Sequence, residues 1–260
     1  MYDHPAARRP APPLRIVVWG EHLHEGWDPR VAAIYPEGMH HAIADGLRDC
    51  LGPAAVVGTA TLEDDWHGLQ SARLAQTDVL FWWGHAAHER VGDDVAENVA
   101  RRVNAGMGLV VLHSAHLAKP FRLLMGTSCA LRWREGDDRE LVWTVDPGHP
   151  IARGVPHPLV IPRHEMYGEY FDIPQPNEQV FISSFSGGEV FRSGCCYRRG
   201  RGRVFYFSPG HESYPIYHMP EIRLILANAA RWAGEGAGAP LHAAGDGSGS
   251  LESLAGWFGR

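Results

Sequence analysis

The sequence predicts an α/β protein with a doubly wound, mostly parallel sheet and an antiparallel β elaboration in its second half. Two observations lead to this fold class. In the first half, short and nearly continuous apolar runs alternate with helical patterns, as expected when helices cover both faces of a parallel sheet. In the second half, strand patterns follow one another with little helix between them. Strand–helix–strand alternation in turn implies right-handed crossovers.

The individual elements follow from these patterns in chain order. The first half contains four predicted strands and three predicted helical segments: strands 14–19, 54–60, 78–83 and 108–113, and helical segments 35–51, 93–106 and 119–126. The second half contains four predicted strands and a closing amphipathic helix: strands 140–145, 180–185, 189–199 and 203–209, and helix 220–233. Glycines in the RRGRGR stretch permit positive φ angles, so we expect a hairpin connection there.

These elements make up a single domain over residues 14–233, flanked by two tails. Residues 1–13 are rich in Pro and Ala and are expected to be a disordered lead, and 234–260 are expected to be a flexible tail. Within that tail, four apolar residues at helical spacing predict a short terminal helix: Leu251, Leu254, Trp257 and Phe258. An exposed Trp257 would favour association into a homo-oligomer.

Composition excludes several classes of protein. The 260 residues include 24 Lys+Arg and 30 Asp+Glu, a net charge of −6, and 45% are hydrophobic. The sequence has no basic stripe of the kind that binds nucleic acid. None of its apolar runs approaches the roughly 18 residues that a membrane span needs. The N-terminus lacks the apolar core of a secretory signal, and the four cysteines form no CxxC motif. We therefore expect a soluble cytoplasmic protein with reduced thiols.

Histidines mark the expected binding edge of the sheet. Ligands of open parallel sheets bind beyond the carboxyl ends of the strands, and the chain has 16 His. Four predicted strands are each followed by imidazoles or carboxylates: Glu21 and His24; His85 and His88; His113 and His116; and His211, Glu212 and Tyr214. The alternative for any one of them is a structural histidine bonded to a backbone carbonyl. The set as a whole favours a functional site.

A fifth candidate segment runs from His164 to Glu169. It places an imidazole, the carboxylates of Glu165 and Glu169 and the phenol of Tyr167 within six residues. Paired carboxylates near histidine suit general acid–base catalysis or metal ligation. The alternative is a solvated turn.

Two further chemistries suit the residues at the end of strand 108–113. His113 and His116 are spaced to share a divalent metal, Zn or Mn, with His24, Glu165 or His211, although no compact motif fixes the ligand set. Ser114 stands where a nucleophile elbow would, but it lacks the flanking glycines of that motif. A helix-capping role is the preferred interpretation of Ser114.

Several long blocks resemble the ThuA-like family of trehalose-utilisation proteins, over residues 14–233. The blocks include VVWGEHLHE, FWWGHAAHERV, HEMYGEYFDIP and FSPGHESYP. The resemblance implies a flavodoxin-like core related to class I glutamine amidotransferases. It also implies sugar chemistry, since family members are associated with 3-keto-glycosides made with an oxidoreductase partner of the glucose–fructose oxidoreductase type. The amidotransferase nucleophilic Cys is absent, with His113 and Ser114 at that turn, and Gly20 and His22 depart from the expected first loop.

These observations predict an enzyme that acts on a glycoside or 3-keto-glycoside by acid–base, metal-assisted isomerisation, elimination or hydrolysis. The candidate catalytic residues are His113, Glu165, His211 and Glu212. The candidate sugar-binding residues are Glu21, His24, His85, Ser114, Tyr167, Glu169 and Tyr214, with Trp19 and Trp83 as further stacking candidates. No GxGxxG motif follows the first strand, so we expect no NAD in this chain. Two alternatives remain: a hydrolase using Ser114, His211 and Glu212, and a non-catalytic sugar-sensing subunit of an oxidoreductase complex.

Overall fold

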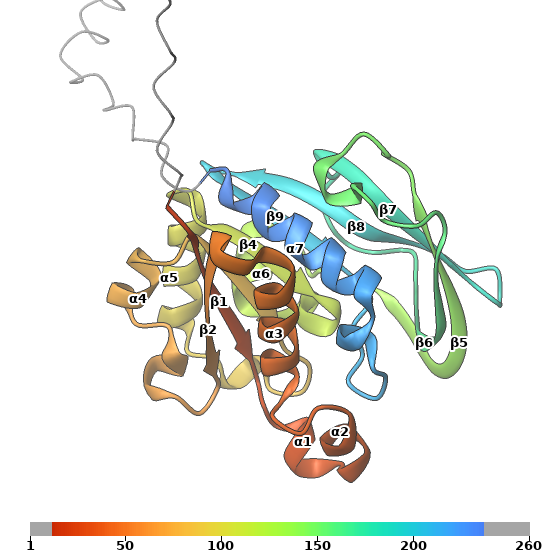
Figure 1. Ribbon diagram of the computed structural model, residues 1–260, viewed down its shortest axis with the longest axis horizontal. Coiled ribbons are helices and arrows are strands. Elements are labelled where there is room, and N and C mark those ends of the chain that lie inside the picture. Colours follow the sequence, from red (N-terminus) through yellow and green to blue (C-terminus); the bar gives the residue numbers. More distant parts are fainter. Residues whose placement is uncertain (1–11, 237–260) are drawn as a thin grey trace, which may run out of the picture.

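The computed structural model describes residues 12–236, which build one nine-stranded sheet with helices on its two faces (Figure 1). The strand order is β2-β1-β3-β4-β9-β8-β7-β5-β6. The strands are β1 Leu14–Gly20, β2 Ala55–Thr61, β3 Val79–Trp83, β4 Gly108–Leu112, β5 Arg132–Thr144, β6 Leu159–Gly168, β7 Glu178–Phe185, β8 Val190–Arg199 and β9 Gly202–Phe207. The α-helices are α1 His24–Trp27, α2 Pro29–Ile34, α3 Met39–Leu51, α4 Ser71–Ala75, α5 Asp93–Asn104, α6 Lys119–Met125 and α7 Pro220–Gly234.

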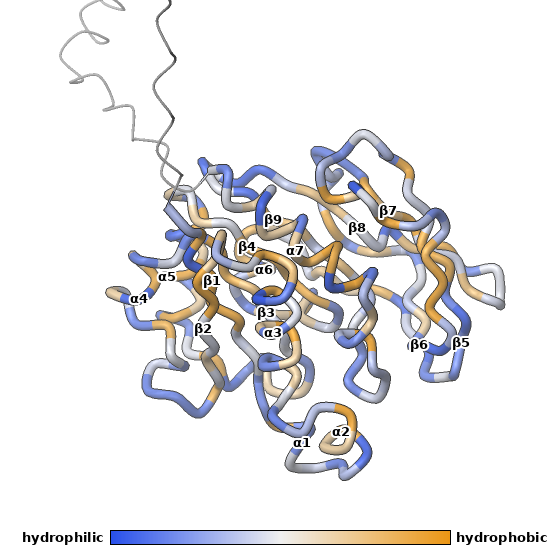
Figure 2. The backbone as a smooth tube through the Cα atoms, viewed as in Figure 1, coloured by the Kyte–Doolittle hydropathy of each residue, from blue (hydrophilic) through white to orange (hydrophobic). Residues whose placement is uncertain are grey.

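The parallel half of the sheet consists of β2, β1, β3, β4 and β9, and both of its faces are covered. Alternate side chains of one strand enter different cores, as strand geometry requires. Ile16 and Val18 of β1 pack in the core that includes α3 and α7. Val17 and Trp19 pack in the core that includes α5 and α6. This two-sided burial explains the continuous apolar runs of the sequence, and Figure 2 shows apolar stretches along these elements with polar residues in the loops.

The antiparallel half consists of β8, β7, β5 and β6, and it confirms the predicted elaboration. The expected hairpin joins β8 to β9, with Gly200 in the turn at φ 56°. One predicted strand boundary was wrong, and one strand was not predicted. β5 begins at Arg132, eight residues earlier than expected, because its first part is exposed and carries polar residues rather than an apolar run. β6 was not expected, because Pro162 and the charged residues after it interrupt its pattern.

Other boundaries also differ from the predictions. The helix expected from residue 35 begins at Met39, because Gly38 takes a φ of 95° and separates it from the short α2. The predicted helices 93–106, 119–126 and 220–233 are confirmed to within two residues. Most of the lead and the proposed terminal helix with Trp257 lie outside the described residues. Among residues 12–236, none of the helices combines the length and the apolar character needed to span a membrane.

Candidate functional site

The loops after β1, β3, β4 and β9 converge at the carboxyl ends of the parallel strands, where β6 also contributes side chains. Four histidines meet there. The ring centroids of His24 and His85 are 5.0 Å apart, and those of His113 and His211 are 5.4 Å apart. His85 connects the two pairs, because its ring centroid is 5.8 Å from that of His211 and 6.5 Å from that of His113. The tertiary structure thus brings together residues that are almost 190 positions apart in the chain.

The inner cluster consists of His113, Glu165 and His211, all of them buried. One polar atom from each residue lies within 4.8 Å of the other two. Glu165 Oε2 is 3.1 Å from Nε2 of His113, and the Tyr167 hydroxyl is 3.2 Å from the same nitrogen. His113 comes directly after β4 with a left-handed backbone, φ 52°. That sharp turn places its imidazole in the cluster instead of continuing the strand.

Hydrogen bonds assign opposite roles to the two imidazoles of the inner cluster. Nδ1 of His113 donates to the carbonyl of Ser208 at 2.7 Å, so its Nε2 presents a lone pair. Nδ1 of His211 instead accepts from the N–H of Ser213 at 3.1 Å. A neutral His211 therefore carries its proton on Nε2, a buried atom without a hydrogen-bond partner. The cluster therefore pairs an imidazole nitrogen that accepts a hydrogen bond, Nε2 of His113, with one that can donate a hydrogen bond, Nε2 of His211.

Burial sets the charges in this cluster. It lowers the pKa of His113 well below its ordinary value and that of His211 to about 4, so both rings are neutral at neutral pH. Burial also raises the pKa of the Glu165 carboxyl. Tyr167 stacks on His113 at 4.7 Å, and burial raises the pKa of its phenol, so it remains a hydroxyl donor.

The outer cluster consists of His24, His85 and Glu212. Nδ1 of His85 is 3.2 Å from Glu212 Oε2, and Nε2 of His24 is 3.7 Å from Glu212 Oε1. Burial acts to raise the pKa of Glu212, but the surrounding histidines hold it well below its usual range. Burial lowers the pKa of His24, whereas at His85 the neighbouring carboxylate outweighs burial and raises the pKa. Trp83 packs edge-on against His24 at 5.5 Å and supports this cluster from β3.

The predicted metal set of His24, His113, His116 and His211 is divided by the structure. His113 and His211 belong to the inner cluster and His24 to the outer one. His116 belongs to neither, because its Nδ1 is turned to the carbonyl of Cys129 at 2.6 Å. His113 and His116 both pack against Tyr167, with ring centroids 4.7 and 5.7 Å away, but no shared group of metal donors joins them among the described residues.

Glu21 and Ser114 serve the framework of the site. The Glu21 carboxylate accepts from the N–H groups of Ala86 and Ala87, each at 2.9 Å, and so holds the loop that carries His85. The Ser114 hydroxyl is buried and donates to the carbonyl of Gly84 at 2.8 Å. It makes no helix-capping hydrogen bond, so the expected capping role was wrong.

The structure does not assemble the triad of the alternative hydrolase. In such a triad the histidine Nδ1–H donates to the carboxylate and Nε2 receives the serine proton. Here Nδ1 of His211 accepts from a backbone N–H and is 3.7 Å from Glu212. The Ser114 hydroxyl is directed to Gly84.

Three other predicted binding or stacking residues are placed as follows. Both carboxylate oxygens of Glu169 are engaged by the Arg192 guanidinium, so this side chain serves the antiparallel half of the sheet. Trp19 stacks on Trp82 at 4.1 Å in the core and is not at the site. Tyr214 remains at the site, with its ring 5.6 Å from that of His211.

Sequence reasoning placed His164 in a candidate segment but missed Glu140, its buried partner, which together with it supports the inner cluster. His164 of β6 accepts from the N–H groups of Gly210 and His211 through Nε2, at 3.0 and 3.3 Å. Its Nδ1 is 2.7 Å from the carboxylate of Glu140, which also accepts from the Ser183 hydroxyl at 2.5 Å. Glu140 is fully buried. The sequence signal that could have revealed this pair is the carboxylate of Glu140, which stands at the start of an otherwise apolar strand pattern.

Two open cavities flank the inner cluster and share Glu165 in their walls. One of about 300 Å³ is lined by His85, His116, Trp133 and Tyr167 among others. The other, of about 660 Å³, is lined by residues that include Asp137, His211, Glu212 and Tyr214. Both volumes fall in the range of small-molecule sites.

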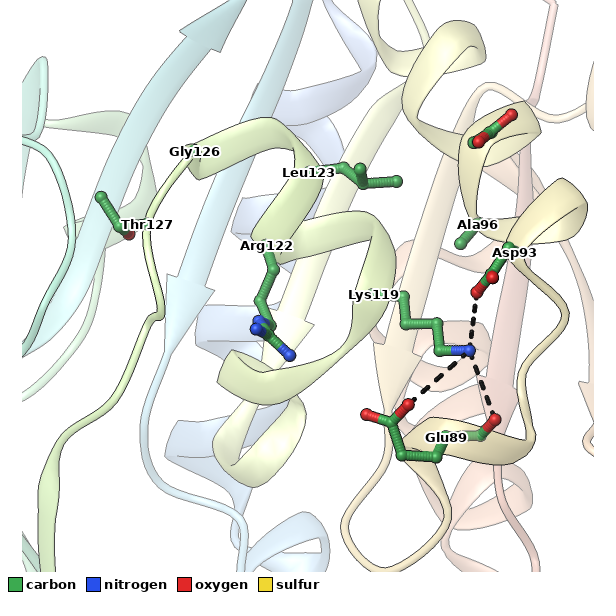
Figure 3. Close-up of a pocket in the computed structure, with 9 residues that line it drawn as sticks. Glu89, Asp93, Ala96, Lys119, Arg122, Leu123, Gly126 and Thr127 are labelled. Carbon is green, nitrogen blue, oxygen red and sulfur yellow. Dashed lines mark hydrogen bonds and ion pairs between the residues drawn. The ribbon is translucent and has the colours of Figure 1, made fainter.

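A third cavity, of about 490 Å³, lies between α5 and α6 (Figure 3). It contains Lys119, whose ammonium is 2.7 Å from Asp93 and 3.9 Å from Glu89. No member of either cluster lines it. Its one ammonium is already neutralised by the two carboxylates, so it offers no comparable chemistry.

Comparisons with known proteins agree with this architecture. A ThuA-like protein from Bacteroides uniformis has a TM-score of 0.61 and 17% identity, covering 89% of this chain and 95% of its own. A second, from Parabacteroides merdae, has a TM-score of 0.61 and 15% identity, with coverages of 86% and 91%. A protein from Salmonella typhimurium described as cytoplasmic has a TM-score of 0.55 and 13% identity, with coverages of 85% and 99%. At such low sequence identity, the TM-scores establish a shared fold and nothing more specific. No curated protein matches this chain in sequence.

The model of the ThuA family, described as trehalose utilisation, matches residues 15–233. That match spans all nine strands and every loop that contributes to the two clusters. A role in sugar metabolism follows from the family. The chain belongs to the ThuA family of trehalose-utilisation proteins.

Proposed function

We propose that this protein is an enzyme that acts on a 3-keto-glycoside derived from trehalose or a related disaccharide. A ketone at C3 acidifies the proton at C2, so a positioned base can form an enediolate. The enediolate isomerises on reprotonation, or it expels the anomeric substituent by β-elimination, after which water adds to the double bond. The reaction needs a base, an acid for the leaving group and a donor for the developing oxyanion.

One observation carries this proposal: the opposed proton states of His113 and His211 inside one buried cluster. The lone pair on Nε2 of His113 suits removal of the C2 proton. The N–H at Nε2 of His211 can hydrogen-bond to the leaving oxygen, but a neutral imidazole is too weak an acid to protonate it. Glu165, whose pKa is raised by burial, lies 3.1 Å from Nε2 of His113 and is the group to which we assign delivery of that proton. The phenol of Tyr167 donates to Nε2 of His113 at 3.2 Å, and in the proposed reaction it would turn to the enediolate oxygen and free that nitrogen's lone pair for the C2 proton.

The surroundings of the cluster suit a sugar. Two open cavities meet at Glu165, so a disaccharide has room on both sides of the reacting carbon. Tyr214 and Trp133 supply aromatic surface in these cavities, and aromatic rings offer sugars an apolar face with a polar edge.

We further propose that an oxidoreductase partner of the glucose–fructose oxidoreductase type supplies the keto-sugar. The loop after β1 reads Gly20-Glu21-His22 and lacks the glycine pattern that binds a dinucleotide. The hydride transfer is therefore assigned to the partner. A cytoplasmic location is supported by four free cysteines and by the description of the Salmonella relative.

The test compares His113→Asn with a matched control, His67→Asn. Both histidines have left-handed backbones, φ 52° and 53°, and both place Nδ1 2.7 Å from a backbone carbonyl. Asparagine tolerates this backbone and can keep that hydrogen bond while removing Nε2. With 3-keto-trehalose as substrate, we expect His113→Asn to lose about 10²–10⁴-fold in rate, as for a general base. His67→Asn should remain near wild type.

Exchange of the C2 proton in heavy water, followed by NMR, identifies the step. Wild type should incorporate deuterium at C2, and His113→Asn should lose this exchange together with product formation. If His113→Asn and His67→Asn lost the same amount of activity, the loss would reflect reduced stability rather than removal of a base. That result would contradict the proposal. Binding of the keto-sugar by wild type without exchange or turnover would favour the sensing subunit instead.

A further inference from the structure

We propose that the outer cluster of His24, His85 and Glu212 binds one divalent transition metal of the zinc type. The three donors come from three separate loops, after β1, β3 and β9, and they converge on one point. Two imidazoles and one carboxylate are the protein ligands of a known class of catalytic zinc site, which leaves a coordination position open. The metal's role in catalysis rests on the proposed function, whereas its binding does not.

The donor spacing is close to that of a formed metal site. Zinc–ligand bonds are about 2.0–2.2 Å, so donors at tetrahedral angles are about 3.4 Å apart. The Glu212 carboxylate oxygens are 3.2 Å from Nδ1 of His85 and 3.7 Å from Nε2 of His24. All three donors lie within 4.8 Å of one another. Small side-chain movements are sufficient to bring them onto one ion.

Unsatisfied polar atoms supply an independent reason. Nδ1 of His85 and Oε2 of Glu212 are both buried and face each other at 3.2 Å as an ion pair, but the pair lacks the geometry of a hydrogen bond. The Glu212 side chain is only 8% exposed. Buried polar atoms without partners destabilise a folded protein, so native structures usually satisfy them with a group or an ion. A cation between these atoms satisfies both.

The inner cluster also has buried atoms without partners, Oε2 of Glu165 and Nε2 of His211, but its tautomers exclude it as the metal site in this arrangement. Nδ1 of His211 already accepts a backbone hydrogen bond, so its Nε2 carries a proton and cannot ligate. The two clusters therefore divide the chemistry, with the metal in the outer cluster and proton transfer in the inner one. The ring of His85 is 5.8 Å from that of His211, so one substrate can contact both clusters. In the proposed reaction, the metal would polarise the C3 ketone oxygen.

The first experiment measures metal binding without any sugar. The full chain is stripped with a chelator and titrated with Zn²⁺ by calorimetry and with Co²⁺ by visible absorption. We expect one equivalent of metal in wild type. Loss of a supporting residue around a metal already costs about 10–100-fold in affinity, so loss of a ligand in His24→Gln or Glu212→Gln should cost at least about 100-fold. Two variants are used in case one of them fails to fold, which circular dichroism would reveal. The folded variant then still tests the site.

His113→Asn is the matched control for binding, because it alters the neighbouring cluster and leaves the three donors in place. It should keep the metal affinity of wild type. Absence of Zn²⁺ and Co²⁺ binding in wild type would overturn the inference. Binding that is lost in His113→Asn but kept in Glu212→Gln would also overturn it, because the ion would then belong to the inner cluster.

Turnover separates this inference from the proposed function. The 3-keto-disaccharide is supplied to metal-loaded and stripped protein. A bound metal with no turnover in either form would refute the proposed function and leave the metal site standing. Full turnover by the stripped protein would support the proposed function and refute the catalytic role of the metal. Turnover that returns only when metal is added supports both the proposed function and the catalytic role of the metal.

Discussion

His40 makes the stability of this protein depend on pH in a way that a single substitution removes. It lies at the start of α3 and is 3% exposed. Burial lowers its pKa to about 3, and the neighbouring His22 and His41 act in the same direction, while Asp64 acts weakly against them. The His22 ring is 4.8 Å away and the His41 ring 4.6 Å away. Folding therefore requires His40 to be neutral.

The sign and size follow from proton linkage. The folded pKa is lower than the ordinary value of 6.5, so below that pH the unfolded chain binds a proton that the folded chain does not. The stabilisation that a neutral His40 provides is complete above pH 6.5 and is lost as the pH falls below it. The loss levels off only near the pKa of His40 in the folded protein. With pKa values of 6.5 and about 3, the His40 contribution lost at pH 5 is about 2 kcal/mol.

The assay is urea unfolding of wild type and His40→Gln at about pH 7.5 and pH 5, with ΔG from linear extrapolation. Other titrating groups affect wild type and His40→Gln alike. The difference between their decreases in unfolding free energy from the higher to the lower pH therefore gives the contribution of His40. Wild type should lose about 2 kcal/mol more than the variant. His41→Gln, on the same helix, keeps His40 and should keep the larger loss. Equal losses in wild type and His40→Gln would refute the reasoning.

Two further substitutions test the framework. Ser114→Ala removes a buried hydrogen bond to Gly84 and should cost about 1 kcal/mol in urea unfolding while keeping turnover of the keto-sugar; abolished turnover would restore the serine hydrolase alternative. Gly202→Ala places a Cβ against the Val103 carbonyl oxygen, and such overpacking should lower the free energy of unfolding by about 1–3 kcal/mol. Its control, Gly26→Ala, meets open space and should be neutral or stabilising by about 0.4–1 kcal/mol, so equal effects of the two glycine changes would contradict the close packing.

Local sequence determined the parallel half of the sheet and the edge at which the histidines gather. The runs that became β1, β3 and β4 are buried on both faces, so their apolar continuity was visible without a structure. The carboxyl ends of parallel strands share one edge, so the residues that follow them could be placed together in advance. The first part of β5 and all of β6 were not visible, because their exposed and site-lining residues replace the apolar pattern.

Only the tertiary structure decided how the histidines are grouped. Sequence spacing suggested that His113 and His116 would share a metal, but Nδ1 of His116 is bonded to the Cys129 carbonyl, and His113 is grouped instead with Glu165 and His211. Which nitrogen carries a proton depends on partners distant in the chain, such as the Ser208 carbonyl for His113. The grouping of His24 with Glu212 likewise joins the loops after β1 and β9. Sequence patterns report local periodicity and burial, whereas hydrogen-bond partners and donor distances depend on contacts between segments far apart in the chain.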